Sequence, residues 1–179
     1  MSLSFKFLFL FAILAGTFSQ YCKNSPLDPD NCDYYSECLE AKFHCGPTGY
    51  PLGYGGKYCK KFLSFYNDFT SEGQAWISKT LLCLKQALIP VYDDSSKTCP
   101  QIYNFAFDSH PQCYYNSGFC SLFGNPRIGF DTIKALLKVF EIRDMIALSS
   151  FKQILIVAGM CGGSVLQVIM KFIKDILIG

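Results

Sequence analysis

The chain has 179 residues, half of them hydrophobic, so it can bury the core of one domain of ordinary size. Its 16 basic and 14 acidic side chains leave a net charge of +2, which excludes the strong basic bias typical of nucleic-acid-binding proteins. Ten cysteines are too many for an ordinary cytosolic domain, and 17 Phe and 11 Tyr against one Trp indicate a packed aromatic core.

The first 20 residues are predicted to form a secretory signal peptide. Lys6 supplies a positive start, and the apolar run Phe7–Ala15 has the length of a signal-peptide core. Thr17 and Ser19 provide the small residues of a cleavage site, so we expect cleavage directly after Ser19 or one residue later. A membrane anchor is the alternative, but the run is shorter than a spanning helix requires. The mature chain, residues 21–179, is therefore expected to be one secreted, extracellular domain.

The first part of the mature chain predicts little regular structure. Residues 21–56 are rich in Pro, Gly, Asp and Tyr, which favour turns, and a short helix is predicted around Tyr34–Phe43. Four cysteines lie in this stretch, so we expect disulfides to hold it. The turn residues of the Gly46–Tyr58 loop indicate that it is exposed and open to contacts with a partner.

A helical pattern begins at Lys57, where four aromatic residues share one face: Tyr58, Phe62, Phe65 and Phe69. Ser71 and Gln74 have the spacing of a capping box, which predicts a helix that runs to Ile89 and ends at Pro90. A third helix is predicted from Pro100 to about Asp108, where the His110-Pro111 pair interrupts it.

The C-terminal part predicts three further elements. Residues 118–129 are expected to form a loop, and Asp131 to open a helix with a suitably placed negative charge in its first turn. A second helix is predicted over about Met145–Met160, and Ser164 with Gln167 forms a capping box for the last helix, to Leu177. No stretch alternates convincingly at period two. The predicted fold class is mainly α: a disulfide-stapled helical domain with an irregular N-terminal segment.

The apolar C-terminal segment requires a choice between a core element and a membrane span. Gln153–Met170 is nearly long and apolar enough to span a membrane. Gly162 and its neighbour break it, however, and Gln167, Lys171 and Lys174 lie on one face of the last helix, which makes that helix amphipathic. We therefore expect buried or amphipathic helices, one of which could serve as an interaction face, and no membrane insertion. A single-pass or lipid-anchored tail is the alternative.

No pattern in the sequence predicts an active site, a bound metal or a cofactor. A secreted calcium-dependent phospholipase would need a His base beside an Asp, and Asp108 and His110 are the nearest candidates. Pro111 follows His110 directly, and a Gly-rich calcium loop is lacking, so a turn in which Asp108 caps backbone amides is preferred. His44 is interpreted as structural. We predict a non-enzymatic domain and keep a phospholipase-type hydrolase as the alternative.

The ten cysteines all follow the signal peptide: Cys22, Cys32, Cys38, Cys45, Cys59, Cys83, Cys99, Cys113, Cys120 and Cys161. Zinc sites favour closer cysteine pairs together with His, a spacing that this chain lacks. An even number of cysteines in the oxidising secretory route predicts five disulfides, and their pairing cannot be chosen from the count alone.

The spacing of the later cysteines, however, carries a more specific signal. From Cys59 to Cys120 the successive steps are 24, 16, 14 and 7 residues. Cys59-Lys60-Lys61-Phe62-Leu63 matches a Cys-x-x-Phe-Leu segment, and residues 69–84 match a Phe-x-x-x-Gly-x-x-Phe helix start with Trp76 at the aromatic position. A Cys-Tyr…Cys-Ser segment follows at Cys113. These features, over nearly the whole mature chain, resemble the stanniocalcin family.

The resemblance implies both a pairing and a role. The implied bridges are Cys22–Cys38, Cys32–Cys59, Cys45–Cys99, Cys83–Cys113 and Cys120–Cys161. The family is associated with calcium and phosphate homeostasis and with inhibition of pappalysin metalloproteinases, which implies a hormone-like protein that binds a receptor or an extracellular protease. The family's eleventh, subunit-joining cysteine is absent here, which leaves a non-covalent homodimer open. No Asn-x-Ser/Thr site is present, so N-glycosylation is not expected.

Overall fold

The computed structural model describes residues 21–22, 28–141, 143–144 and 147–178. Every regular element in this part of the chain is helical, with no strand, which confirms the mainly-α prediction. The predicted signal peptide, residues 1–20, lies outside the described residues and stays a prediction. None of the helices in the described ranges has both the length and the apolar character that crossing a membrane requires.

The segment expected to be irregular consists mostly of short helical turns. The wide π-helical turn η2 (Tyr34–Glu40) leads into α2 (Ala41–Phe43), a second such turn, η3 (Tyr50–Gly56), continues directly into α3 (Lys57–Ser64), and the 3₁₀ turn η4 (Tyr66–Asp68) follows. The predicted short helix is therefore present. The prediction of an exposed loop between residues 46 and 58 holds only for residues 47–48 and is wrong for the rest, where Tyr50, Pro51, Gly55 and Gly56 are buried.

A close ring contact explains why this segment is buried. Gly55 packs against Tyr35, and a Cβ atom at Gly55 would lie only 2.5 Å from the Tyr35 ring. The missing side chain thus lets η3 lie directly on η2, and glycine here serves close packing rather than a turn. Turn-forming composition alone does not distinguish these two uses.

The next three helices, α4 (Ser71–Ala87), α5 (Ile89–Asp93) and α6 (Cys99–Asn116), differ from the predictions at their ends. Thr70, not Ser71, caps α4, because its hydroxyl accepts from the Gly73 amide at 3.3 Å. Pro90 lies in the first turn of α5 rather than beyond a helix end. Thr98 and Gln101 form a capping box that opens α6, with Gln101 Oε1 accepting from the Thr98 amide at 2.9 Å.

Helix α6 continues through Pro111, contrary to the predicted interruption. A proline inside a helix costs about 3 kcal/mol. Here His110, Pro111 and Cys113 are all buried on the same turn of α6, and Cys113 is bonded to Cys83 of α4. Tertiary packing and a disulfide therefore outweigh a local signal that would otherwise end the helix.

The last elements are the 3₁₀ turn η5 (Phe119–Phe123), α7 (Pro126–Val139), α9 (Leu148–Met160) and α10 (Gly163–Ile178). Helix α7 begins five residues before Asp131, because the Asn125 side chain accepts from the Arg127 amide at 3.0 Å and Pro126 occupies the first turn. The prediction that Ser164 and Gln167 form a capping box is also wrong, because Ser164 already lies inside α10.

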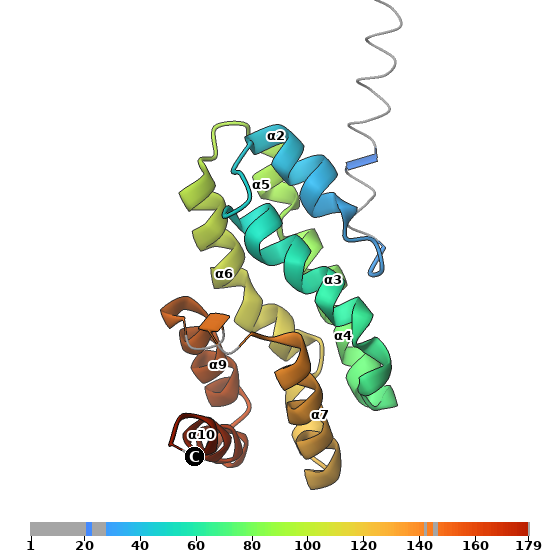
Figure 1. Ribbon diagram of the computed structural model, residues 1–179, viewed down its shortest axis with the longest axis vertical. Helices are drawn as coiled ribbons and strands as arrows, with labels where there is room; N and C mark the ends of the chain where they lie inside the picture. Colours follow the sequence, from blue (N-terminus) through green and yellow to red (C-terminus); the bar gives the residue numbers. More distant parts are fainter. Residues whose placement is uncertain (1–20, 23–27, 142, 145–146, 179) are drawn as a thin grey trace, which may run out of the picture.

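Two regions can be distinguished along the molecule. Figure 1 shows η2 to α5 gathered in one half and α7, α9 and α10 in the other, with α6 reaching from one toward the other. We call the described residues from 21 to 123 the N-terminal region and residues 126–178 the C-terminal region. Helix α6 packs against α4 and also against α9, so it carries contacts on both sides.

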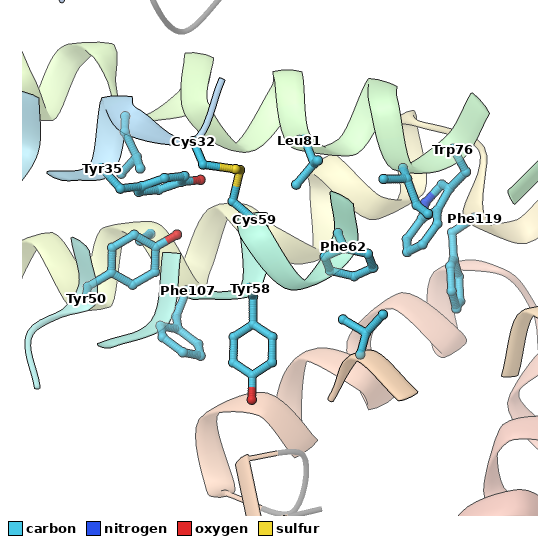
Figure 2. Packing of buried hydrophobic residues seen from close by; sticks show 14 of the residues in the cluster. Cys32, Tyr35, Tyr50, Tyr58, Cys59, Phe62, Trp76, Leu81, Phe107 and Phe119 are labelled. Atoms are coloured by element: carbon cyan, nitrogen blue, oxygen red, sulfur yellow. A yellow bond between two sulfur atoms is a disulfide. The ribbon is translucent and has the colours of Figure 1, made fainter. Parts of the chain in front are cut away.

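Aromatic rings fill the centre of the N-terminal region. Figure 2 shows the Cys32–Cys59 disulfide surrounded by the rings of this core. The Tyr35 and Tyr50 rings meet edge to face with centroids 6.3 Å apart, and Phe62 and Trp76 do the same at 6.1 Å. Edge-to-face contacts of this kind are the favoured geometry for aromatic pairs. The composition-based prediction of a packed aromatic core matches this arrangement.

The structure pairs all ten cysteines. The bridges are Cys22–Cys38, Cys32–Cys59, Cys45–Cys99, Cys83–Cys113 and Cys120–Cys161, which are the pairs that the family resemblance implies. The first four close within the N-terminal region. Only Cys120–Cys161 connects that region with the C-terminal helices, because Cys161 directly follows α9.

Candidate functional site

The two regions meet along a seam of tyrosine side chains. Tyr50, Tyr54 and Tyr58 follow one another at intervals of four residues along η3 and α3, so they lie on one helical face. The Tyr54 hydroxyl lies 3.3 Å from Oγ of Ser150, and the Tyr58 hydroxyl donates to Oδ2 of Asp144 at 2.5 Å. These tyrosines place hydrogen-bonding groups of the N-terminal region against C-terminal residues.

His110 lies at the centre of this seam and is fully buried. Its Nε2 is 3.1 Å from the Tyr50 hydroxyl, and its Nδ1 is 3.0 Å from Oε1 of Gln153 on α9. With the ring proton on Nδ1, the imidazole donates to Gln153 and accepts from Tyr50. Burial lowers the pKa of His110 to about 4, even though the hydrogen bond that the ring donates to Oε1 of Gln153 acts in the opposite direction. The imidazole is therefore neutral at physiological pH.

The tyrosines around His110 also remain uncharged. Burial raises the pKa of Tyr50 and of Tyr114 well above the ordinary value, and it raises the pKa of Tyr54 to about 12. Their hydroxyls thus stay protonated and act as hydrogen-bond donors or acceptors. A neutral, dry histidine between protonated phenols holds helices together and offers no charge to a reacting group.

The structure does not bring Asp108 and His110 together. Both belong to α6, but Asp108 is exposed whereas His110 is buried. Residues two positions apart on a helix point to different faces, so this carboxylate cannot orient that imidazole. The preferred interpretation of Asp108 as a cap in a turn is also wrong, because it lies in the middle of a helix. His44 ends α2 in a left-handed backbone conformation with φ 51°, which agrees with a structural role.

An ionic cluster closes one end of the seam. Nζ of Lys57 lies 2.7 Å from Oδ2 of Asp144 and 3.0 Å from Oε2 of Glu141, while Lys61 reaches Oε1 of Glu141 at 3.0 Å. Hydrogen bonds from Lys57 and from Tyr58 lower the pKa of the Asp144 carboxyl. These ion pairs hold the chain segment that follows α7 against α3.

The cysteines offer no reactive thiol. All ten are disulfide-bonded, so none is available as a nucleophile or a thiolate ligand. Within the described ranges, no group of three or more His, Cys, Asp and Glu side chains lies together in the arrangement that a metal ion would need.

The C-terminal helices expose large apolar side chains. Ile156 and Met160 lie one turn apart on α9 and are 41% and 37% exposed, and Val168 and Met170 on α10 are 49% and 42% exposed. Val168 and Met170, two positions apart, point to different sides of α10. We call these four exposed apolar positions together the α9–α10 surface. Helices α9 and α10 pack on each other, and exposed apolar side chains on neighbouring elements make this part of the molecule a candidate interaction site. The amphipathic pattern of the last helix indicated an interaction face, but it did not identify these positions.

The fold and the five bridges define a disulfide-stapled, all-helical domain. The stanniocalcin family model matches residues 19–177, which is nearly the entire chain. The chain therefore belongs to the stanniocalcin family. A search of the curated proteins and a search of the solved structures give no match.

Proposed function

We propose that this protein is a secreted, hormone-like signalling protein without enzymatic activity, and that it acts by binding a receptor or an extracellular protease. The observation that carries the proposal is the family match over residues 19–177. Following the family's association, the proposed physiological role is in calcium and phosphate homeostasis. Five disulfides support secretion, because such bridges form and persist in oxidising compartments.

The proposed mode of binding is non-covalent. Covalent inhibition of a protease through a disulfide would require a free thiol, and all ten cysteines of this chain are paired with one another. The complex should therefore form without a new bridge and dissociate on dilution. The α9–α10 surface is the proposed contact, because buried apolar side chains supply most of the free energy of binding in protein interfaces.

The proposal can be tested with the purified secreted protein on two probes. The first is a pappalysin metalloproteinase, for which cleavage of a protein substrate is measured before and after dilution of the complex. The second is the intact cell surface, for which saturable binding of labelled protein and uptake of calcium and phosphate are measured. Reversible inhibition, or saturable binding with changed ion uptake, supports the proposal. A lack of effect on both probes contradicts it.

A variant pair locates the contact. Ile156→Glu combined with Val168→Glu places charge on the α9–α10 surface, and we expect binding to weaken by at least about tenfold, as for loss of a central apolar contact. Gln112→Glu introduces a charge at an exposed position of α6 and is the control, with unchanged binding expected. Sedimentation of the unbound protein, measured first, reveals whether a second copy covers the surface. Wild-type binding by the double variant would exclude this surface as the contact.

A further inference from the structure

An apolar cavity lies between the two regions, beside the tyrosine seam. Its volume is about 110 Å³. Phe62, Trp76 and Phe119 line it from the N-terminal region, and Ile133, Leu136 and Val157 from the C-terminal region. Figure 2 shows the Phe62 and Phe119 rings directed toward the C-terminal helices. Protein interiors are normally close-packed, with few voids larger than a water molecule, so a space of this size between aromatic rings requires an explanation.

One polar group in the cavity wall lacks a partner. Gln153 lines the cavity and is only 5% exposed. Its Oε1 is engaged by Nδ1 of His110, but its Nε2 has no hydrogen-bond partner. Other polar groups of the wall have partners: Oγ of Ser150 lies 3.3 Å from the Tyr54 hydroxyl, and the Tyr114 hydroxyl lies 3.3 Å from Nδ1 of His110. Buried amide nitrogens are almost always hydrogen-bonded, so Nε2 of Gln153 marks where an acceptor atom is missing.

We propose that this cavity binds a small apolar molecule, a single aromatic ring or a short aliphatic chain, that carries one hydrogen-bond-accepting oxygen directed at Nε2 of Gln153. Apolar cavities of this kind stay dry, and an engineered cavity of about 150 Å³ takes up benzene. The cavity of this protein belongs to the same size class. The proposed ligand would fill the space between the two regions and satisfy the one unpaired amide nitrogen in its wall.

The single tryptophan of the chain provides a direct signal for binding. The indole N–H of Trp76 donates to the backbone oxygen of Tyr114 at 3.3 Å, and both residues line the cavity. The ¹⁵N-labelled protein therefore gives one indole N–H resonance, which reports on the cavity. The probes are acetophenone and α-methylstyrene, which share one shape and differ in the oxygen that accepts a hydrogen bond. Both are titrated while this resonance is followed.

We expect both probes to shift the indole resonance and acetophenone to bind about two- to tenfold tighter, the contribution of one hydrogen bond. Gln153→Leu should remove this preference while retaining the binding of α-methylstyrene. If neither probe moves the resonance, the cavity takes no such ligand and the proposal is wrong. If wild-type protein binds both equally, or if Gln153→Leu keeps the preference, Nε2 does not recognise the oxygen and the proposal is also overturned.

A cavity-filling variant separates binding in the cavity from binding elsewhere. Val157→Phe adds a ring at a buried position of the wall and should abolish the binding of both probes. If circular dichroism shows that this variant does not fold, Leu136→Phe at a less buried wall position replaces it. Undiminished binding by a folded filled variant would place the ligand outside the cavity and contradict the proposal. The test requires no protein partner, so its outcome is independent of the proposed signalling function.

Discussion

The N-terminal and C-terminal regions are stabilised in different ways. Four of the five disulfides close within the N-terminal region, and its aromatic rings pack on one another around Cys32–Cys59. The C-terminal helices have one bridge, Cys120–Cys161, and otherwise meet the rest of the chain through non-covalent contacts, which include the tyrosine seam, ion pairs and a shared hydrophobic core. The N-terminal region is thus a scaffold closed by four disulfides, whereas the C-terminal region, which presents the α9–α10 surface, is joined to it by one disulfide and by non-covalent contacts.

The largest effect is expected from removing a bridge of the scaffold. Replacing Cys45 and Cys99 with serine opens a bridge between residues 54 positions apart and should lower the free energy of unfolding by about 4 kcal/mol, mainly because the unfolded chain gains entropy. The measurement is urea unfolding followed by circular dichroism. The turns before α4 would keep their own two bridges but lose the disulfide that joins them to α6, so we also expect reduced secretion.

The matched change in the other region should have a local effect. Replacing Cys120 and Cys161 with serine opens a bridge of similar span, 41 residues, but the scaffold keeps its other four bridges. Hydrogen exchange should then accelerate in α9 and α10 while the amides of α4 stay protected. Equal acceleration in α4 would show that the two regions unfold as one unit and would contradict the comparison.

The next largest effect is expected from protonation of His110, which should lower the free energy of unfolding in acid. Its folded pKa of about 4 lies below the ordinary value of 6.5, so the unfolded chain binds a proton first as the pH falls. Stability should be fully present above pH 6.5 and decline between pH 6.5 and about 4, by roughly 3 kcal/mol in total. Urea unfolding at a series of pH values measures this slope.

A histidine-free seam provides the control. His110→Gln keeps a polar side chain beside Tyr50 and Gln153 but does not titrate, so its stability should change less between pH 6.5 and about 4 than that of wild type. Carboxylates contribute equally to both proteins, and the difference between the two curves isolates His110. If the stabilities of the two proteins changed in parallel with pH, His110 would have an ordinary pKa and would not be shielded from solvent.

The smallest effect is expected at the ionic end of the seam. Asp144→Asn keeps the shape of the side chain but removes the charge that faces Lys57, and we expect a loss of about 1 kcal/mol, because the carboxylate is only 20% exposed. Asp68→Asn, which removes the more exposed ion pair with Lys138, is the control and should cost less. Thermal unfolding at low and high salt measures both. An equal loss of stability in the two variants would mean that Asp144 contributes no more than an ordinary exposed ion pair.

Sequence patterns anticipated the helices better than their ends. Periodic apolar residues indicated α3, α4 and α7, because a buried face leaves a repeated signal along the chain. The ends depended on single side chains. Ser71 and Thr70 are adjacent and chemically similar, so only the structure shows which hydroxyl accepts the hydrogen bond from the Gly73 amide. Pro111 was predicted to interrupt α6. Its burial and the nearby Cys83–Cys113 bridge, which allow the helix to continue, are properties of the tertiary fold that a local sequence pattern does not show.

The seam could be predicted only in part. Tyr50, Tyr54 and Tyr58 recur every four residues, a spacing from which one helical face could have been inferred had the glycines between them not indicated a loop. Gln153 was named as the first residue of the apolar run that ends at Met170, and its role depends on His110, 43 residues earlier in the chain. Lys85 is buried and donates to the backbone oxygens of Asp28, Pro29 and Asn31, although its sequence context is that of an ordinary helix surface. Contacts between distant segments leave no periodic signal.

The most direct test of the account is a disulfide map of the secreted protein, obtained by mass spectrometry of non-reduced peptides with a count of free thiols. The account predicts Cys22–Cys38, Cys32–Cys59, Cys45–Cys99, Cys83–Cys113 and Cys120–Cys161, with no thiol left over. That result would support the scaffold and the non-covalent mode of binding together. A different pairing would contradict the scaffold, and a free thiol at any of the ten positions would contradict both.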